Sequence, residues 1–134
     1  MTMRSLLGAA LVGALLAGCA APPPKPAAPP PSGLSDLMER PAERSLFEGI
    51  RAYDDGSYVQ AETALRKALS QGLASGRDQA TAHKLLAFVT CTSDRIGECE
   101  SEFRAARAAD PAFALSRSEA GHPVWGPVYK RVLP

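Results

Sequence analysis

The chain has 134 residues, 46% of them hydrophobic, with 15 basic and 14 acidic side chains. This length leaves room for one domain at most. A formal net charge of +1 gives no electrostatic basis for binding nucleic acid, which depends on neutralising phosphates, or for a polybasic attachment to anionic lipid. We therefore expect no nucleic-acid partner.

The first 18 residues have the composition of an export signal. Arg4 is their only charge, and an apolar run of 11 residues follows from Leu6 to Leu16. That run is too short to cross a bilayer as a permanent helix, which takes about 20 residues. We interpret residues 1–18 as a cleaved signal peptide. Its removal takes Arg4 from the 15 basic residues and leaves 14 against 14 acidic ones, so the mature chain is close to neutral.

The apolar run ends in Leu16-Ala17-Gly18-Cys19, which resembles the lipobox of bacterial lipoproteins. The resemblance implies that Cys19 is lipidated: its thiol receives a diacylglycerol, the chain is cut before it, and the new amine is acylated. These covalent chains, and no separate cofactor, would hold the protein in a membrane. Position 20 is not the aspartate that marks inner-membrane retention in enteric bacteria, so the resemblance implies the outer membrane, at its periplasmic face. An ordinary apolar signal with a chance cysteine is the alternative.

Residues 19–33 join the lipidated cysteine to a linker of proline and alanine. Seven of the fourteen residues from 20 to 33 are proline. Such a segment cannot form a packed core and favours polyproline II at ~3.1 Å per residue, which gives a semi-rigid spacer of roughly 40 Å. The alternative to this stalk is an unselected disordered tail.

The composition of residues 34–134 favours a helical domain, because alanine, leucine, arginine and glutamate dominate it and β-branched residues are few. Two apolar stripes share the spacing 3, 4, 3 and lie 38 residues apart; they are Tyr58, Ala61, Leu65 and Ala68, and Ile96, Cys99, Phe103 and Ala106. Each stripe follows another helical segment, residues 42–54 after Pro41 and residues 78–91. Turn sequences at 54–57 and 92–94 separate the partners. The sequence thus predicts two antiparallel helix pairs.

Residues 49–68 resemble a tetratricopeptide repeat. The positions that carry this resemblance are Gly49, Gly56, Tyr58, Ala61, Leu65 and Ala68, and in a second copy Leu86, Ala87, Phe103, Ala106 and Pro111. We expect the small residues to let paired helices approach closely. The chain departs from the family at Glu48, where a large apolar residue is usual, and at Cys99, which replaces an alanine. The connection 71–77 also lengthens the repeat period by about four residues relative to the usual one.

Two helix pairs leave apolar end faces unless something covers them. Ser116 to Glu119 has the character of a helix start, and apolar residues follow at spacings of three to four: Val124, Trp125, Val128, Tyr129 and Val132. We expect residues 116–132 to form a capping helix that breaks near Gly126-Pro127. Trp125 and Tyr129 are either core anchors or an exposed docking patch. The predicted fold class is all-α: two tetratricopeptide-like antiparallel helix pairs and a C-terminal capping helix, after a signal peptide and a disordered proline-rich tether.

Cys91 and Cys99 remain once Cys19 is lipidated. They would end one helix and begin its antiparallel partner, in a compartment that permits disulfides. We expect a bridge worth about 2 to 3 kcal/mol, with two buried free thiols as the alternative. His83 and His122 lie neither at metal-ligand spacing from these cysteines nor beside a nucleophile. We therefore interpret both as ordinary surface or packing histidines and expect no metal site, no catalytic residue and no enzymatic activity.

The repeat resemblance also implies a binding surface, because first helices line the concave groove of that family. By alignment its residues are Leu46, Ile50, Tyr53, Lys84 and Phe88. An aromatic and aliphatic strip with one cation suits a peptide or helix from a partner protein. The same strip can instead pack against the C-terminal cap.

The lipobox, the linker, the helix pairs and the ending Gly-His-Pro-Val-Trp-Gly-Pro at 121–127 together resemble small lipoproteins associated with bacterial type VI secretion systems. This resemblance implies an accessory role and a partner that is an envelope protein or a component of the secretion apparatus. We expect a lipid-anchored adaptor that recruits such a partner. The alternative is a periplasmic carrier of a small apolar ligand or lipid.

Overall fold

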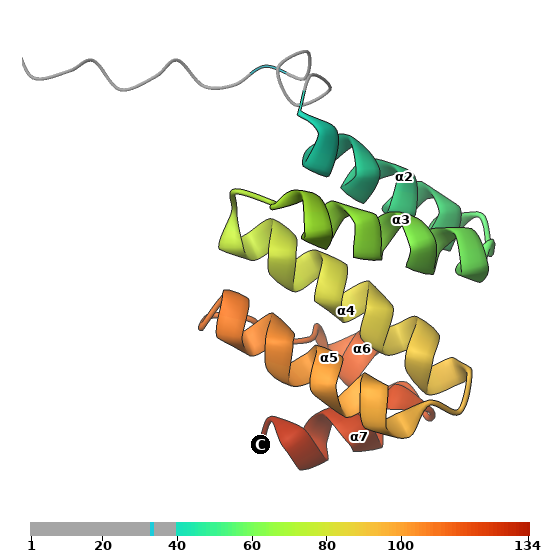
Figure 1. The fold of residues 1–134 in the computed structure, drawn as a ribbon. Helices are drawn as coiled ribbons and strands as arrows, with labels where there is room; N and C mark the ends of the chain where they lie inside the picture. Colours follow the sequence, from blue (N-terminus) through green and yellow to red (C-terminus); the bar gives the residue numbers. More distant parts are fainter. Residues whose placement is uncertain (1–32, 34–39) are drawn as a thin grey trace, which may run out of the picture. The chain divides into compact units, whose positions relative to one another are not determined.

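The computed structural model describes residue 33 and residues 40–134. In this part of the chain six helices form and no strand (Figure 1). The helices are α2 (Pro41–Asp54), α3 (Tyr58–Gln71), α4 (Gly76–Thr92), α5 (Ile96–Ala109), α6 (Arg117–Ala120) and α7 (Trp125–Val132). The all-α prediction is confirmed. The predicted signal peptide, Cys19 and the proline-rich linker lie outside the described residues. None of the described helices is both long and apolar enough to span a membrane.

Two antiparallel hairpins, α2–α3 and α4–α5, stack on each other through α3 and α4 (Figure 1). Their bounds follow from local chemistry. Pro41 is the first residue of α2, where its missing N–H removes no helical hydrogen bond. Helix α4 begins two residues earlier than predicted, because the Ser75 side chain accepts a hydrogen bond from the Asp78 amide. Asp110 is extended and Pro111 follows it, so α5 ends as predicted.

The core lies between the hairpins. Its fully buried apolar residues are Ala61, Leu65, Ala68, Ala82, Leu86, Ala87, Cys99, Phe103 and Ala106. Both predicted stripes are therefore buried except at their first residues, since Tyr58 is 49% exposed and Ile96 is partly buried. A Cβ added to Gly49 would lie 2.7 Å from Cγ of Leu65. The missing side chain thus allows α2 to lie close against α3, as predicted.

Helices α6 and α7 form the C-terminal cap, and α7 packs on α4 and α5. Ser116 and Glu119 cap α6 reciprocally through side chain and backbone, which confirms the predicted helix start. The predicted break near Gly126-Pro127 is wrong, because the chain turns at 121–124 instead. Pro127 lies in the first turn of α7, where backbone N–H groups have no helical partner. A Cβ on Gly126 would lie 2.5 Å from the Ala120 carbonyl oxygen, so glycine lets α7 start against the end of α6.

Candidate functional site

A groove of about 390 Å³ lies between α2, α4 and the cap. We call it the α2–α4 groove, and its lining residues are Ile50, Tyr53, Asp54, Thr81, Lys84, Leu85, Phe88, Glu119 and Trp125. Four of the five predicted groove residues line it: Ile50, Tyr53, Lys84 and Phe88. The structure thus brings together side chains from both hairpins, as the repeat resemblance implied.

Two of the predicted groove residues are less accessible than expected. Leu46 is 7% exposed and belongs to the core, because it lies on the side of α2 that packs inward. Phe88 is 4% exposed, and its ring stacks on Trp125 with 4.2 Å between ring centroids. Leu46 is therefore not a groove residue, and Phe88 forms a floor that Trp125 covers.

The cap residues themselves are core anchors. Trp125 and Tyr129 are each 9% exposed. The Trp125 indole N–H donates to the Glu119 carbonyl oxygen at 2.9 Å, and the Tyr129 hydroxyl accepts from the Leu115 amide at 3.2 Å. Both side chains thus bury an apolar ring and satisfy their polar atom. Of the two alternatives for this pair, the structure favours the core anchors over the exposed docking patch.

An ion pair links the two sides of the α2–α4 groove. Lys84 Nζ lies 2.7 Å from a Glu119 carboxylate oxygen and 5.8 Å from the centre of the Phe88 ring. Burial alone would raise the pKa of Glu119, but the hydrogen bonds from Lys84 and Ser116 and the charge of Lys84 lower it below its ordinary value. Glu119 is therefore ionised at neutral pH and holds the cap to α4.

Tyr53 presents a neutral phenol at the groove rim. Burial raises its pKa, and the neighbouring groups Tyr58, Asp54 and Glu119 raise it further. Its ring also contacts Tyr58, with 5.5 Å between centroids, which extends the aromatic surface past the end of α2. The groove thus combines a partly exposed aliphatic residue, a neutral phenol and an ammonium group already paired with a carboxylate.

Two further side chains belong beside this surface and were missed. Phe47 is 54% exposed and precedes Ile50 by three residues, so both lie on the same side of α2. The prediction placed Leu46 on the strip, and counting back three residues from Ile50 would have given Phe47 instead. His122 stacks on Trp125 with 3.3 Å between ring centroids. That stacking agrees with the interpretation of His122 as a packing residue, but no local pattern indicated its partner.

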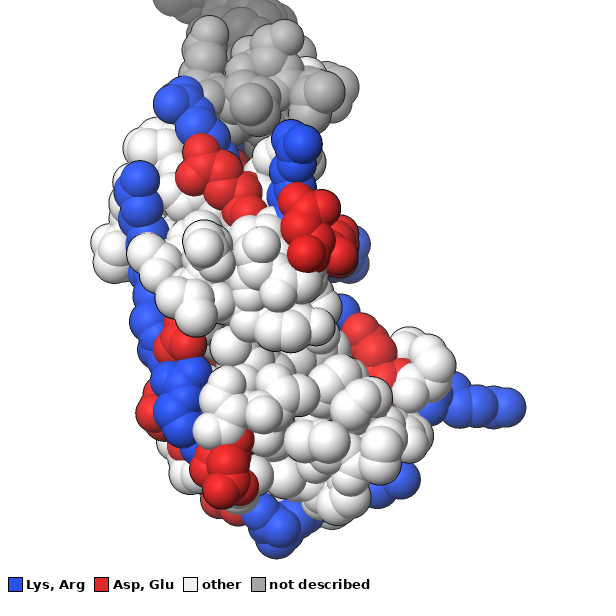
Figure 2. Space-filling view, turned by 90° about the vertical axis from the view of Figure 1, so that its right-hand side faces the viewer, with Lys and Arg blue, Asp and Glu red and all other residues white. Residues whose placement is uncertain are grey.

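A network of ion pairs joins the two hairpins away from the groove. Arg66 of α3 lies within 4 Å of Glu62 on its own helix and of Glu98 and Glu102 on α5. Arg95 donates two hydrogen bonds to Glu62, at 2.6 and 2.9 Å, and these bonds, with Arg66, lower the pKa of Glu62 to about 2. Figure 2 shows basic and acidic side chains along the left-hand margin of one face and uncharged side chains across its middle.

Cys91 and Cys99 form a disulfide with 5.2 Å between their Cα atoms, and both residues are buried. The predicted bridge is confirmed, and it joins α4 to α5 at their connecting turn. His83 of α4 forms a side-chain hydrogen bond of 2.6 Å with Glu102 of α5, so it links these two helices. Within the described residues no group of three or more His, Cys, Asp or Glu is placed to hold a metal ion.

These features define a short helical-repeat domain that carries its own C-terminal cap. Comparison with protein-family models, with curated proteins and with solved structures finds no match.

Proposed function

We propose that this protein is a lipid-anchored adaptor that binds another envelope protein through the α2–α4 groove. The observation that carries the proposal is the composition of that groove. Ile50 and Tyr53 are partly exposed there beside the aromatic floor of Phe88 and Trp125. Concave strips of this kind accept the apolar side chains of a peptide or helix.

Lys84 adds a polar contact that a partner can share. Its side chain is 25% exposed even while it is paired with Glu119. A carboxylate on the partner can therefore approach Lys84 from the solvent side without first breaking the cap. Such a charged contact would fix the orientation of the bound segment more than its affinity.

The membrane anchor and the cellular setting rest on the sequence. The lipobox resemblance supports lipidation of Cys19 and placement at the periplasmic face of the outer membrane, and the resemblance to type VI secretion lipoproteins supports an accessory role in such an apparatus. Anchoring on a spacer of roughly 40 Å confines the groove near the membrane. The resulting high local concentration allows weak contacts to recruit the partner.

The test is a crosslinking pull-down of the full chain from cell envelopes, comparing wild type with Ile50→Ala and Tyr53→Ala. We expect both variants to lose at least about fivefold of the captured partner, the equivalent of ~1 kcal/mol. Lys130→Ala is the control, because Lys130 is exposed on α7 outside the groove. Unchanged capture by groove variants that keep the wild-type helical circular dichroism would refute the proposal. Metabolic labelling with a palmitate analogue tests the anchor separately, because the wild-type chain should be labelled and Cys19→Ser should not.

The carrier alternative would place an apolar ligand between the hairpins and the cap. The described residues fill that space with rings: Phe88 stacks on Trp125, and Phe103 meets Tyr129 edge to face at 5.3 Å. We therefore favour the adaptor. Native mass spectrometry of the purified protein separates the two, because a carrier would retain its ligand.

A further inference from the structure

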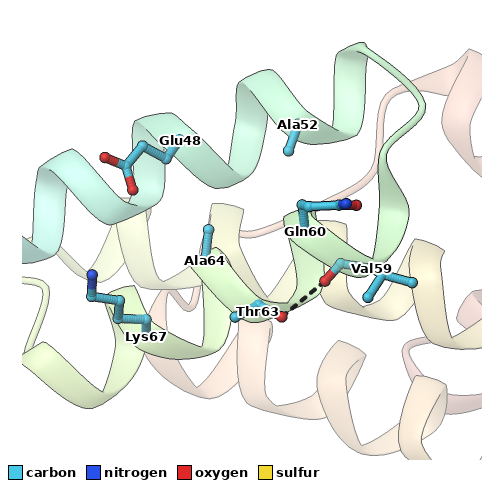
Figure 3. Close-up of a pocket in the computed structure, with 7 residues that line it drawn as sticks. All are labelled: Glu48, Ala52, Val59, Gln60, Thr63, Ala64 and Lys67. Carbon is cyan, nitrogen blue, oxygen red and sulfur yellow. Dashed lines mark hydrogen bonds between the residues drawn. The ribbon is translucent and has the colours of Figure 1, made fainter.

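The first hairpin, α2–α3, has an outer surface on the side that faces away from the core residues of α3. An open groove of about 390 Å³ lies between α2 and α3, and Figure 3 shows the side chains that line it. We call it the α2–α3 face, and its residues are Glu48, Ala52, Val59, Gln60, Thr63, Ala64 and Lys67. In a stacked helical array a neighbouring hairpin covers this side. No described helix of this chain packs there besides α2 and α3 themselves.

The face carries exposed apolar surface and two short side chains. Val59 is 76% exposed, the largest exposed fraction among the large hydrophobic side chains that the structure describes. Ala52 on α2 and Ala64 on α3 have short side chains, which let a further helix approach the backbone closely. The face therefore has room for helices and has apolar surface to bury against them.

Opposite charges stand at one end of the face. Glu48 on α2 and Lys67 on α3 point toward each other across the groove in Figure 3. Neither forms an ion pair with any residue in the described part of the chain. On the other side of α3, by contrast, Glu62 and Arg66 are both paired. One acidic and one basic group are thus available at the same level of the face, one on each helix.

We propose that the α2–α3 face binds the same face of a second copy of this chain, so that the two hairpins form a four-helix bundle. In a two-fold interface the same patch meets itself, and each contact occurs twice. With the axis parallel to the helices, α2 of one copy lies against α3 of the other. Glu48 then meets the partner's Lys67, and Lys67 meets the partner's Glu48.

The charge positions select this axis over the other possible two-fold axis in the interface plane. An axis perpendicular to the helices would place α2 against the partner's α2 and would exchange the two ends of the face, so that Glu48 would not meet a lysine. The parallel axis also places the start of α2 at the same end of both copies. That arrangement suits two chains anchored in one membrane, as proposed above.

Charge reversal tests the dimer. The full chain, purified in detergent, is measured by sedimentation equilibrium over a range of concentrations as wild type, Glu48→Lys, Lys67→Glu and the double variant. We expect wild type to dimerise and each single reversal to weaken dimerisation by at least about tenfold, because two attractive pairs become repulsive. The double variant restores both pairs and should return to within about threefold of wild type. Lys130→Glu, which changes the net charge by the same amount as Lys67→Glu, should leave dimerisation unchanged.

A photoreactive amino acid at Thr63, which is exposed on the face, identifies the occupant in intact envelopes. A crosslinked product at twice the mass of this chain supports the dimer. A product of any other mass, or a crosslink within one chain to residues 34–39, overturns it. Monomeric wild type at all concentrations, or a double variant no better than the single variants, overturns it as well. The α2–α4 groove variants are measured in the same way. We expect them to lose the captured partner but to dimerise like wild type, so the two proposals can fail separately.

Discussion

Replacing Trp125 by alanine removes one of the main contacts between the cap and the repeats. Trp125 is 9% exposed, its ring stacks on Phe88 and His122, and its indole N–H donates to the Glu119 carbonyl oxygen. We expect the variant to fold and to be less stable, because the two hairpins keep their own core.

The size of the effect follows from these contacts. Truncating a buried large aromatic residue costs about 3 to 5 kcal/mol, which includes ~0.5 to 1.5 kcal/mol for an aromatic pair and ~1 kcal/mol for a hydrogen bond. Trp125 lies at the end of the domain, where water can fill the vacated space, so we expect a loss of about 3 kcal/mol. Trp125→Phe keeps a stacked ring and loses the donor, so it should cost about 1 kcal/mol.

Urea unfolding followed by far-ultraviolet circular dichroism measures this loss. With a slope of about 1 to 1.5 kcal/mol per molar urea, a loss of 3 kcal/mol lowers the midpoint by about 2 to 3 M. Trp125 is the only tryptophan in the chain, so wild-type fluorescence reports the cap directly. Coincident fluorescence and dichroism curves would show that the cap unfolds together with the hairpins.

A midpoint shift below about 0.5 M in Trp125→Ala would refute the reasoning, because it would mean that the ring stack contributes little to stability. A wild-type fluorescence transition that precedes the dichroism transition would refute it in a second way. The cap would then open independently of the hairpins, and Trp125 would not anchor it to them.

Two further predictions concern ion pairing and helix packing in the hairpins. The hydrogen bonds from Arg95, and then Arg66, lower the pKa of Glu62 from 4.5 to about 2, so its stabilisation is present above pH 4.5 and is lost as the pH falls towards 2. Glu62→Gln should lower the unfolding free energy by about 1 to 3 kcal/mol at pH 7, less than the full shift implies because solvent screens the partly exposed arginines. The difference from wild type should vanish near pH 2, and equal urea midpoints at pH 7 would contradict this account. Gly49→Ala should destabilise the protein by about 1 to 3 kcal/mol, because the new Cβ meets Leu65 at 2.7 Å. Gly97→Ala on α5, where no atom lies within 4 Å of the new Cβ, should stabilise the protein by up to ~1 kcal/mol. If the two variants shift the thermal midpoint in the same direction, the steric argument is contradicted.

Local patterns were enough to locate α2 to α5. Their buried positions recur with the helical period, and residues such as Pro41 and Pro111 mark ends through backbone chemistry that acts within a few residues. The break in the cap was misplaced because the effect of a proline depends on its position in the helix. In the first turn, where Pro127 lies, the missing N–H costs nothing, whereas the same residue would break a helix at its middle.

The groove could be predicted only in part. Helical spacing and the repeat resemblance placed Ile50, Tyr53 and Lys84 on one surface, and the structure brings them together. The exposure of each residue depends on packing between distant segments. Phe88 lies under Trp125, which is 37 residues later in the chain, and no local pattern specifies that contact.

The disulfide makes the two hairpins mechanically unequal. Tension applied to the chain from its N-terminal side enters the described domain at Arg40 and first peels α2 from α3, where only packing and side-chain contacts resist. When it reaches the second hairpin it passes from Cys91 to Cys99 through the sulfur–sulfur bond, so residues 92–98 carry no load while the bridge is oxidised. A domain pulled from its N-terminal side would therefore lengthen first in the α2–α3 hairpin and would keep the turn between α4 and α5 closed throughout.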